Sequence, residues 1–127
     1  MLFRSAGADF ALTQPVYEAA PAREFIRRYE DKYGPLTLPI LAGVLPLYNT
    51  RHANFLHNEV PGITIPETLR QRMAAAGQAG AEEGVRIAQE LLSELRGVVR
   101  GAYLMPPFGR YELAAEILDS LRAKIPL

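Results

Sequence analysis

The stretch from residue 38 to residue 47 constrains the fold of this 127-residue chain more than any other. It reads Leu-Pro-Ile-Leu-Ala-Gly-Val-Leu-Pro-Leu, without the alternation of apolar and polar positions that a half-exposed strand shows. Continuous apolarity over the length of a strand is typical of a strand covered on both faces, which occurs chiefly in parallel sheets. Because Pro39 and Pro46 cannot donate to a strand ladder, we predict a buried strand over residues 40–45.

Two further strands and five helices are predicted around this segment. Residues 9–13 form a short apolar run, which we interpret as a buried strand that ends at Gln14 and Pro15. Residues 98–105 form the third strand, and we expect residues 102–105 to be its most buried part. The helices, predicted from apolar residues at helical spacing, span residues 21–33, 50–59, 66–73, 82–96 and 111–122.

A strand followed by a helix, three times over, predicts an α/β domain with a parallel sheet and right-handed crossovers. We treat residues 1–127 as one domain and expect the apolar helix faces, which include Phe25, Tyr33 and Leu118, to be buried. A three-stranded parallel sheet has two unpaired edges, and a complete eight-unit barrel takes about 250 residues. The chain is therefore predicted to be a segment of a larger β/α barrel.

Composition and motifs exclude several classes of function. Lys and Arg number 14 and Asp and Glu also number 14, so the net charge is zero, which argues against nucleic-acid and membrane-surface partners. The chain has no cysteine, and no apolar run reaches the ~20 residues of a membrane span, so we expect a cytoplasmic protein. His52 and His57 fall on different faces of a helix, so no metal site is predicted.

Polar side chains follow the predicted strands at their carboxyl ends, where α/β proteins bind ligands. The amide of Gln14 offers a donor and an acceptor, which suits a pterin or a nicotinamide, although it could equally satisfy loop backbone groups. Arg110 begins a helix, where the helix dipole disfavours a cation, so it could bind a ligand carboxylate or phosphate. The alternatives for Arg110 are an ion pair with Glu112 or a solvated side chain. Three aromatic residues near these ends either stack on a ligand or pack in the core: Tyr48, Tyr103 and Phe108.

Four segments carry a resemblance to a known family. They are residues 7–17 (Gly-Ala-Asp-Phe-Ala-Leu-Thr-Gln-Pro-Val-Tyr), 42–47 (Ala-Gly-Val-Leu-Pro-Leu), 55–63 (Phe-Leu-His-Asn-Glu-Val-Pro-Gly-Ile) and 103–112 (Tyr-Leu-Met-Pro-Pro-Phe-Gly-Arg-Tyr-Glu). In this order they resemble the methylenetetrahydrofolate reductase family. The resemblance is closest to the reductase half of bifunctional homocysteine S-methyltransferase/methylenetetrahydrofolate reductases.

The resemblance implies an FAD-binding TIM (β/α)8 barrel, of which this chain supplies the last three units. In that family NAD(P)H reduces the flavin, which reduces 5,10-methylenetetrahydrofolate to 5-methyltetrahydrofolate in one-carbon and methionine metabolism. Gln14 matches a glutamine that contacts the pterin and the nicotinamide in turn, and Arg110 matches an arginine that contacts the folate. His52 stands where some members have a substrate-contacting glutamine, and Leu56 where some have a stacking phenylalanine.

The resemblance also implies that this chain is incomplete as an enzyme. The general-acid glutamate and most of the flavin contacts of the family lie in earlier units, so the chain is expected to hold part of the folate site and to lack activity alone. The alternative is a non-catalytic half-barrel that associates with a separate N-terminal half, or with a second copy of itself, through strand edges.

Overall fold

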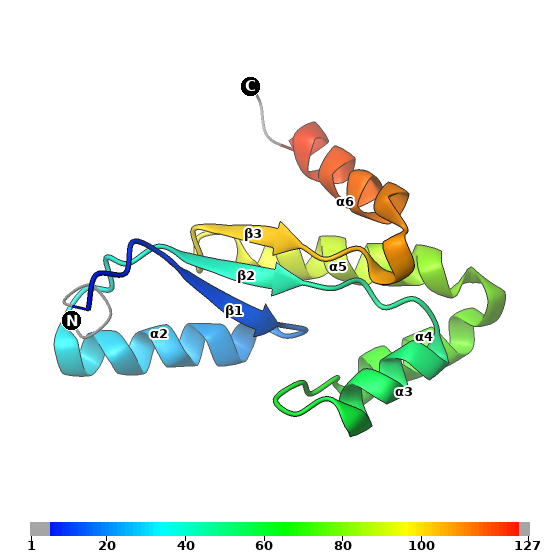
Figure 1. Ribbon diagram of the computed structural model, residues 1–127, viewed down its shortest axis with the longest axis horizontal. Helices are drawn as coiled ribbons and strands as arrows, with labels where there is room; N and C mark the ends of the chain where they lie inside the picture. The colour runs from blue at the N-terminus through cyan, green and yellow to red at the C-terminus, as the bar shows by residue number, and fades with distance from the viewer. Residues whose placement is uncertain (1–5, 125–127) are drawn as a thin grey trace.

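The computed structural model describes residues 6–124 and contains a three-stranded parallel sheet in the order β1-β2-β3 (Figure 1). The strands are β1 (Ala11–Pro15), β2 (Ile40–Val44) and β3 (Gly101–Leu104). The helices are α2 (Ala19–Tyr33), α3 (Thr50–Glu59), α4 (Glu67–Ala76), α5 (Gly80–Leu95) and α6 (Tyr111–Lys124), with 3₁₀ turns η1 (Gly77–Ala79) and η2 (Pro107–Gly109). This arrangement confirms the α/β class and the parallel sheet.

β1 is bulged at its carboxyl end. Leu12 pairs with Leu41 and Pro15 pairs with Gly43, so β1 advances three residues where β2 advances two. The Gly43 N–H donates to the Thr13 hydroxyl oxygen (2.9 Å), which replaces a regular ladder bond. Prolines are tolerated at strand edges and bulges. The strand therefore spans Ala11–Pro15, and the prediction that Gln14 and Pro15 end a strand over residues 9–13 is wrong.

The helix-side core lies between β2 and α5. Ala42 and Val44 of β2 are buried against the face of α5 that its helical spacing predicts. That face consists of Val85, Ala88, Leu91, Leu92 and Leu95. Leu113 and Ile117 of α6 join the same core, but Leu118 is 48% exposed, so the prediction that it is buried is wrong.

The two outer strands are less buried than predicted. Phe10 and Leu12, in the segment predicted as a buried strand, are each 56% exposed, and Ala102 of β3 is exposed as well. Phe25 and Tyr33 on α2 are also about half exposed. These predictions fail because a pattern of apolar residues shows which face of an element tends to be buried, but not whether another element covers that face. β1 and β3 have no outer neighbour among the described residues.

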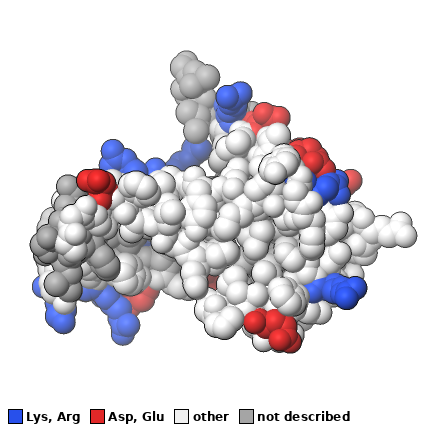
Figure 2. All heavy atoms as spheres, viewed as in Figure 1, with Lys and Arg blue, Asp and Glu red and all other residues white. Residues whose placement is uncertain are grey.

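One face of the sheet is open. In Figure 1, α5 runs behind β2 and β3, while no helix crosses in front of them. Figure 2 shows that charged side chains gather at the periphery of this face and leave its centre largely uncharged. On this face the ring of Tyr103 reaches over Gly43, and its hydroxyl donates to the Thr13 carbonyl oxygen, so a side chain of β3 is bonded to β1 across β2.

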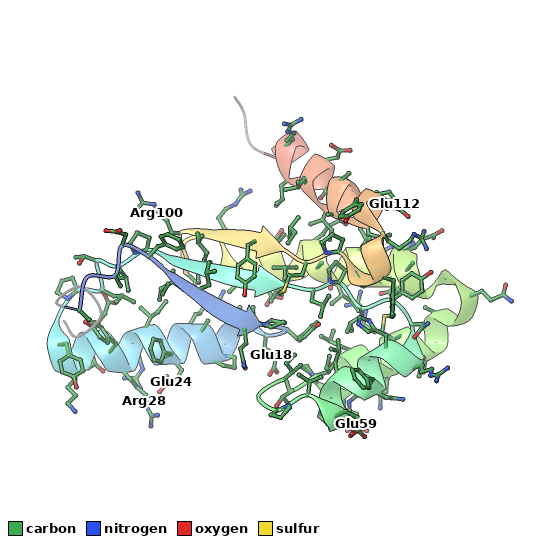
Figure 3. The ribbon with its side chains drawn as sticks, in the orientation of Figure 1. Glu18, Glu24, Arg28, Glu59, Arg100 and Glu112 are labelled. Carbon is green, nitrogen blue, oxygen red and sulfur yellow. The ribbon has the colours of Figure 1, made fainter. Side chains whose placement is uncertain are left out.

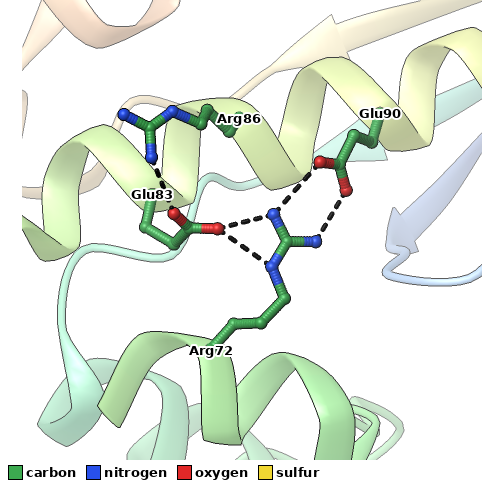
Figure 4. Close-up of polar contacts among 4 residues, drawn as sticks. All are labelled: Arg72, Glu83, Arg86 and Glu90. Carbon is green, nitrogen blue, oxygen red and sulfur yellow. Dashed lines mark hydrogen bonds and ion pairs between the residues drawn. The ribbon is translucent and has the colours of Figure 1, made fainter. Parts of the chain in front are cut away.

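The helical pair α3–α4 is fixed to α5 by apolar and charged contacts. A second core cluster forms there from Tyr17, Leu47, Ala53, Leu56, Ile63, Ile65, Met73 and Ile87. Arg72 of α4 donates to Glu83 (2.9 Å from Nε) and to Glu90 (2.6 Å from Nη1) of α5, and Glu83 also pairs with Arg86 (Figure 4). The hydrogen bond from Arg72 holds the pKa of Glu90 below its usual value.

Two glycines let α5 approach the segment that follows β2. A Cβ on Gly84 would overlap the carbonyl oxygen of Leu47, and a Cβ on Gly80 would lie 2.7 Å from the carbonyl oxygen of Tyr48. Only glycine permits this backbone-to-backbone contact, because the obstructing atoms belong to the main chain and cannot rotate away. The backbone of the segment that begins at Leu47 therefore packs in direct contact with the backbone of α5.

Candidate functional site

A hollow of about 470 Å³ lies at the carboxyl edge of the sheet, where the segments after β2 and β3 meet. It is lined by Tyr48, Asn49, Arg51, His52, Phe55 and Phe108. Parallel strands bring their carboxyl ends to one edge, which is why residues from distant parts of the sequence converge here. The walls are mainly aromatic, so the hollow suits a flat ring.

The first turn of α3 fixes the position of Tyr48 and His52. The Asn49 side chain accepts from the His52 N–H (2.7 Å), as a helix N-cap does. The Tyr48 N–H donates to His52 Nδ1 (3.0 Å), so this nitrogen must be unprotonated. Burial lowers the pKa of His52 below its usual value and favours the same neutral state.

We expect this histidine to make the protein sensitive to acid. Because the pKa of His52 is lower in the folded state than in the unfolded chain, its contribution to stability is complete above the unfolded value of about 6.5. That contribution is lost as the pH falls toward the folded value, since protonation of Nδ1 breaks the bond from Tyr48. Thermal unfolding midpoints between pH 8 and 5 measure the loss. The variant His52→Asn keeps a non-titrating acceptor and should lose less; equal losses in both proteins would contradict the assignment.

Arg110 lies against Tyr48 at the start of α6. Its Nη1 donates to the Tyr48 hydroxyl oxygen (2.7 Å), and its guanidinium carbon lies 5.6 Å from the centre of the Tyr48 ring. Its Nε donates to the carboxylate of Glu112, which raises the pKa of Arg110 and lowers that of Glu112. The ion pair with Glu112 was one of the alternatives open for Arg110, and it coexists with the bond to Tyr48.

Phe108 forms the wall of the hollow opposite α3. Its ring is 71% exposed and lies 5.1 Å from the ring of Tyr48 and 5.3 Å from that of His52. Its backbone has φ of 55°, in the left-handed region that residues other than glycine seldom adopt. Such a conformation costs on the order of 1 kcal/mol or more, and it persists mainly at sites that position a ligand.

Gln14 lies beside the loop between α3 and α4. A Cβ on Gly62 would overlap the Gln14 side-chain oxygen, so the two residues are in close contact. The fold thus brings together two of the segments that carry the family resemblance, residues 7–17 and 55–63. Gln14 lies within the bulged carboxyl end of β1 rather than after the strand, and it does not line the hollow itself.

The position facing the hollow is occupied by Phe55, not by Leu56, which was expected there from the resemblance. Leu56 is 5% exposed and packs in the second core cluster, whereas Phe55 is 55% exposed and lines the hollow. Successive helical residues point about 100° apart, so only one of the two can face the hollow. Phe55 was not predicted as a site residue from its sequence context. An exposed aromatic residue next to a core position on an amphipathic helix is the signal that could have found it.

No group of three His, Cys, Asp or Glu residues that could hold a metal ion occurs in residues 6–124. The imidazole of His57 accepts from the Ile65 N–H (3.0 Å) and supports the α3–α4 loop. Over the same part of the chain, no helix is long and apolar enough to cross a membrane.

The residues at the hollow fit an aromatic ligand that carries one anionic group. Aromatic rings supply its walls, and Arg51 is the arginine that lines it. Arg110 does not line the hollow, but its guanidinium is bonded to the hydroxyl of one of the walls, Tyr48. The lining residues do not form a pyrophosphate site for a dinucleotide such as FAD, because they include no glycine-rich turn before the helix, and Asn49 takes up one N–H of the first turn of α3.

Comparisons with known proteins agree with the α/β fold described above. The family model described as methylenetetrahydrofolate reductase matches residues 4–122. The chain is also similar to the solved structure of an uncharacterized protein from Clostridium thermocellum, described as binding two copies of 5-methyl-5,6,7,8-tetrahydrofolic acid. The two are 20% identical with a TM-score of 0.59, and the match covers 95% of this chain but only 45% of that protein. No curated protein matches the chain.

Proposed function

This chain belongs to the methylenetetrahydrofolate reductase family, and from that premise we propose that it contributes part of the family's folate site. The observation that carries the proposal is Arg110, which is bonded to Tyr48 at the wall of an aromatic hollow at the carboxyl edge of the sheet. Folate combines a flat pterin and a benzoyl ring with carboxylates. Aromatic walls and an adjacent arginine match that chemistry.

We propose the following roles within the reaction of the family, the NAD(P)H-driven reduction of 5,10-methylenetetrahydrofolate. Gln14 contacts the pterin and, in turn, the nicotinamide through its amide. Arg110 binds a carboxylate of the folate, while His52 and Phe55 contact its rings. Leu56 is buried in the second core cluster and is given no contact with the folate. FAD supplies the hydride-carrying chemistry when it is bound, and we assign its contacts to the other units of the barrel.

The three strands are proposed to be the last three of a TIM barrel, as in the reductase half of the bifunctional cytoplasmic enzymes. This placement is supported by the order of the family segments and by the fact that the chain spans 45% of a solved structure with a similar fold. On this basis we propose that residues 1–127 alone do not catalyse the reduction, because the family's flavin-binding units are not among them.

A titration of the purified chain tests the proposed folate site. We expect 5-methyltetrahydrofolate to shift the NMR signals of Tyr48, Phe55 and Arg110 with weak, saturable affinity, and an absorbance scan to show no flavin band near ~450 nm. The absence of shifts at these residues at millimolar ligand would overturn the folate assignment. A flavin that saturates one site per chain would overturn the assignment of the flavin contacts to other units.

A second candidate function is favoured by the open face of the sheet. Leu12 and Phe10 are exposed at the edge strand, and the centre of this face carries little charge (Figure 2). Such a surface suits association with the remaining barrel units or with a second copy of the chain. A sizing column run on the same preparation distinguishes these cases. A dimer favours self-association, whereas a compact monomer that unfolds cooperatively counts against an incomplete barrel.

A further inference from the structure

We propose that Tyr48 is a positioning residue for Arg110, a role that rests on the proposed folate site. The hydroxyl of Tyr48 fixes the guanidinium of Arg110 beside the aromatic hollow, so that an anionic group of the ligand meets an arginine already in place. Tyr48 lies between β2 and α3, and Arg110 lies 62 residues later, at the start of α6. The pair therefore also holds together the two segments that form the hollow.

Two contacts define the position of the guanidinium on Tyr48. The hydroxyl oxygen accepts from Nη1 at 2.7 Å, and the guanidinium carbon lies 5.6 Å from the ring centre. The two distances describe one arrangement, in which the hydrogen bond holds the guanidinium at the hydroxyl end of the ring. This bond restricts rotation of the Arg110 side chain.

Tyr48 is itself held firmly enough to serve as a support. Its N–H donates to His52 Nδ1 (3.0 Å), and its carbonyl oxygen lies where only a glycine, Gly80, can face it. Its ring meets the edge of Phe108 with the ring centres 5.1 Å apart. The backbone and the ring of Tyr48 are thus fixed independently of Arg110, as positioning requires.

Glu112 accepts from Nε of Arg110, whereas Tyr48 accepts from Nη1, and the two partners differ in their effect on ligand binding. Both side chains of this ion pair are about half exposed, so water and salt compete with it (Figure 3 labels Glu112). Glu112 also neutralises the charge that a ligand anion needs, whereas the Tyr48 hydroxyl is neutral and leaves that charge available.

The first test measures the motion of Arg110 without any ligand. The variant Tyr48→Phe removes only the hydroxyl, and Tyr111→Phe is the matched control at a neighbouring exposed tyrosine. We expect the Nη signals of Arg110 to be distinct in the wild type and in Tyr111→Phe, and to average in Tyr48→Phe through faster rotation about the Nε–Cζ bond. Unchanged guanidinium signals in Tyr48→Phe would overturn the proposal.

The second test measures binding of 5-methyltetrahydrofolate to the full chain. Tyr48→Phe should weaken the affinity about 3- to 10-fold, the range of one hydrogen bond, while Tyr111→Phe should not. On the background of Arg110→Ala, Tyr48→Phe should add less than about 2-fold, because Tyr48 acts through Arg110. Full additivity would overturn the positioning role. If the wild type binds no folate, the proposed function fails, and the guanidinium signals still decide the role of Tyr48.

Discussion

Replacing Gly84 by alanine is expected to destabilise the protein by about 3 kcal/mol. The added Cβ would overlap the carbonyl oxygen of Leu47, a main-chain atom in a buried contact between α5 and the segment that follows β2. Alanine is the better helix former by about 1 kcal/mol, but this gain is smaller than the cost of forcing α5 away from that segment. A loss of this size is a large part of the 5–15 kcal/mol that typically stabilises a domain. Urea unfolding measures it.

The matched control is Ser93→Ala, at an exposed position on the same helix. It should change the free energy of unfolding by less than about 0.5 kcal/mol. Gly80→Ala is expected to fall between the two, since its Cβ would lie 2.7 Å from the Tyr48 carbonyl oxygen. A Gly84→Ala protein as stable as the wild type would show that the close approach of α5 is not required.

The largest effect on binding is expected from Arg110→Ala. This substitution removes the guanidinium that is bonded to Tyr48 and that is proposed to bind a folate carboxylate. Loss of a charge-assisted contact should weaken binding of 5-methyltetrahydrofolate at least about 10-fold. NMR titration measures the change.

Arg100→Ala is the control for charge. Arg100 lies at the amino end of β3, whereas Arg110 lies past its carboxyl end (Figure 3 labels Arg100). Its removal changes the net charge equally but should leave the affinity unaltered. Similar losses in the two variants would mean that Arg110 contributes only through the overall charge of the chain.

Much of the fold could be predicted because its signals are local. The continuous apolar run of β2 and the helical spacing on α5 depend on residues close in sequence, and both were predicted within a few residues. The burial of Leu12 and Leu118 could not be predicted, since it depends on what covers each face. The two glycines of α5 did indicate its close contact with a neighbouring segment. Two glycines four residues apart in a helix lower its stability, so their presence indicates that another segment packs closely against them.

The candidate site was predicted in outline but not in its contacts. Parallel topology places the carboxyl ends of the strands at one edge, so the position of Gln14, His52 and Arg110 toward that edge follows from the predicted order of elements. That they share one site stays a prediction. The bond between Arg110 and Tyr48 does not follow, because it depends on the side-chain packing of two segments far apart in sequence. The choice between Phe55 and Leu56 likewise required the rotation of α3 about its axis to be known.

The bond that Tyr103 makes to β1 across Gly43 has a consequence for how the sheet can grow. A side chain that bonds the first strand to the third over a glycine fixes all three strands to one another on the open face. A strand added at either edge of the sheet therefore pairs with a unit whose twist and register are already set.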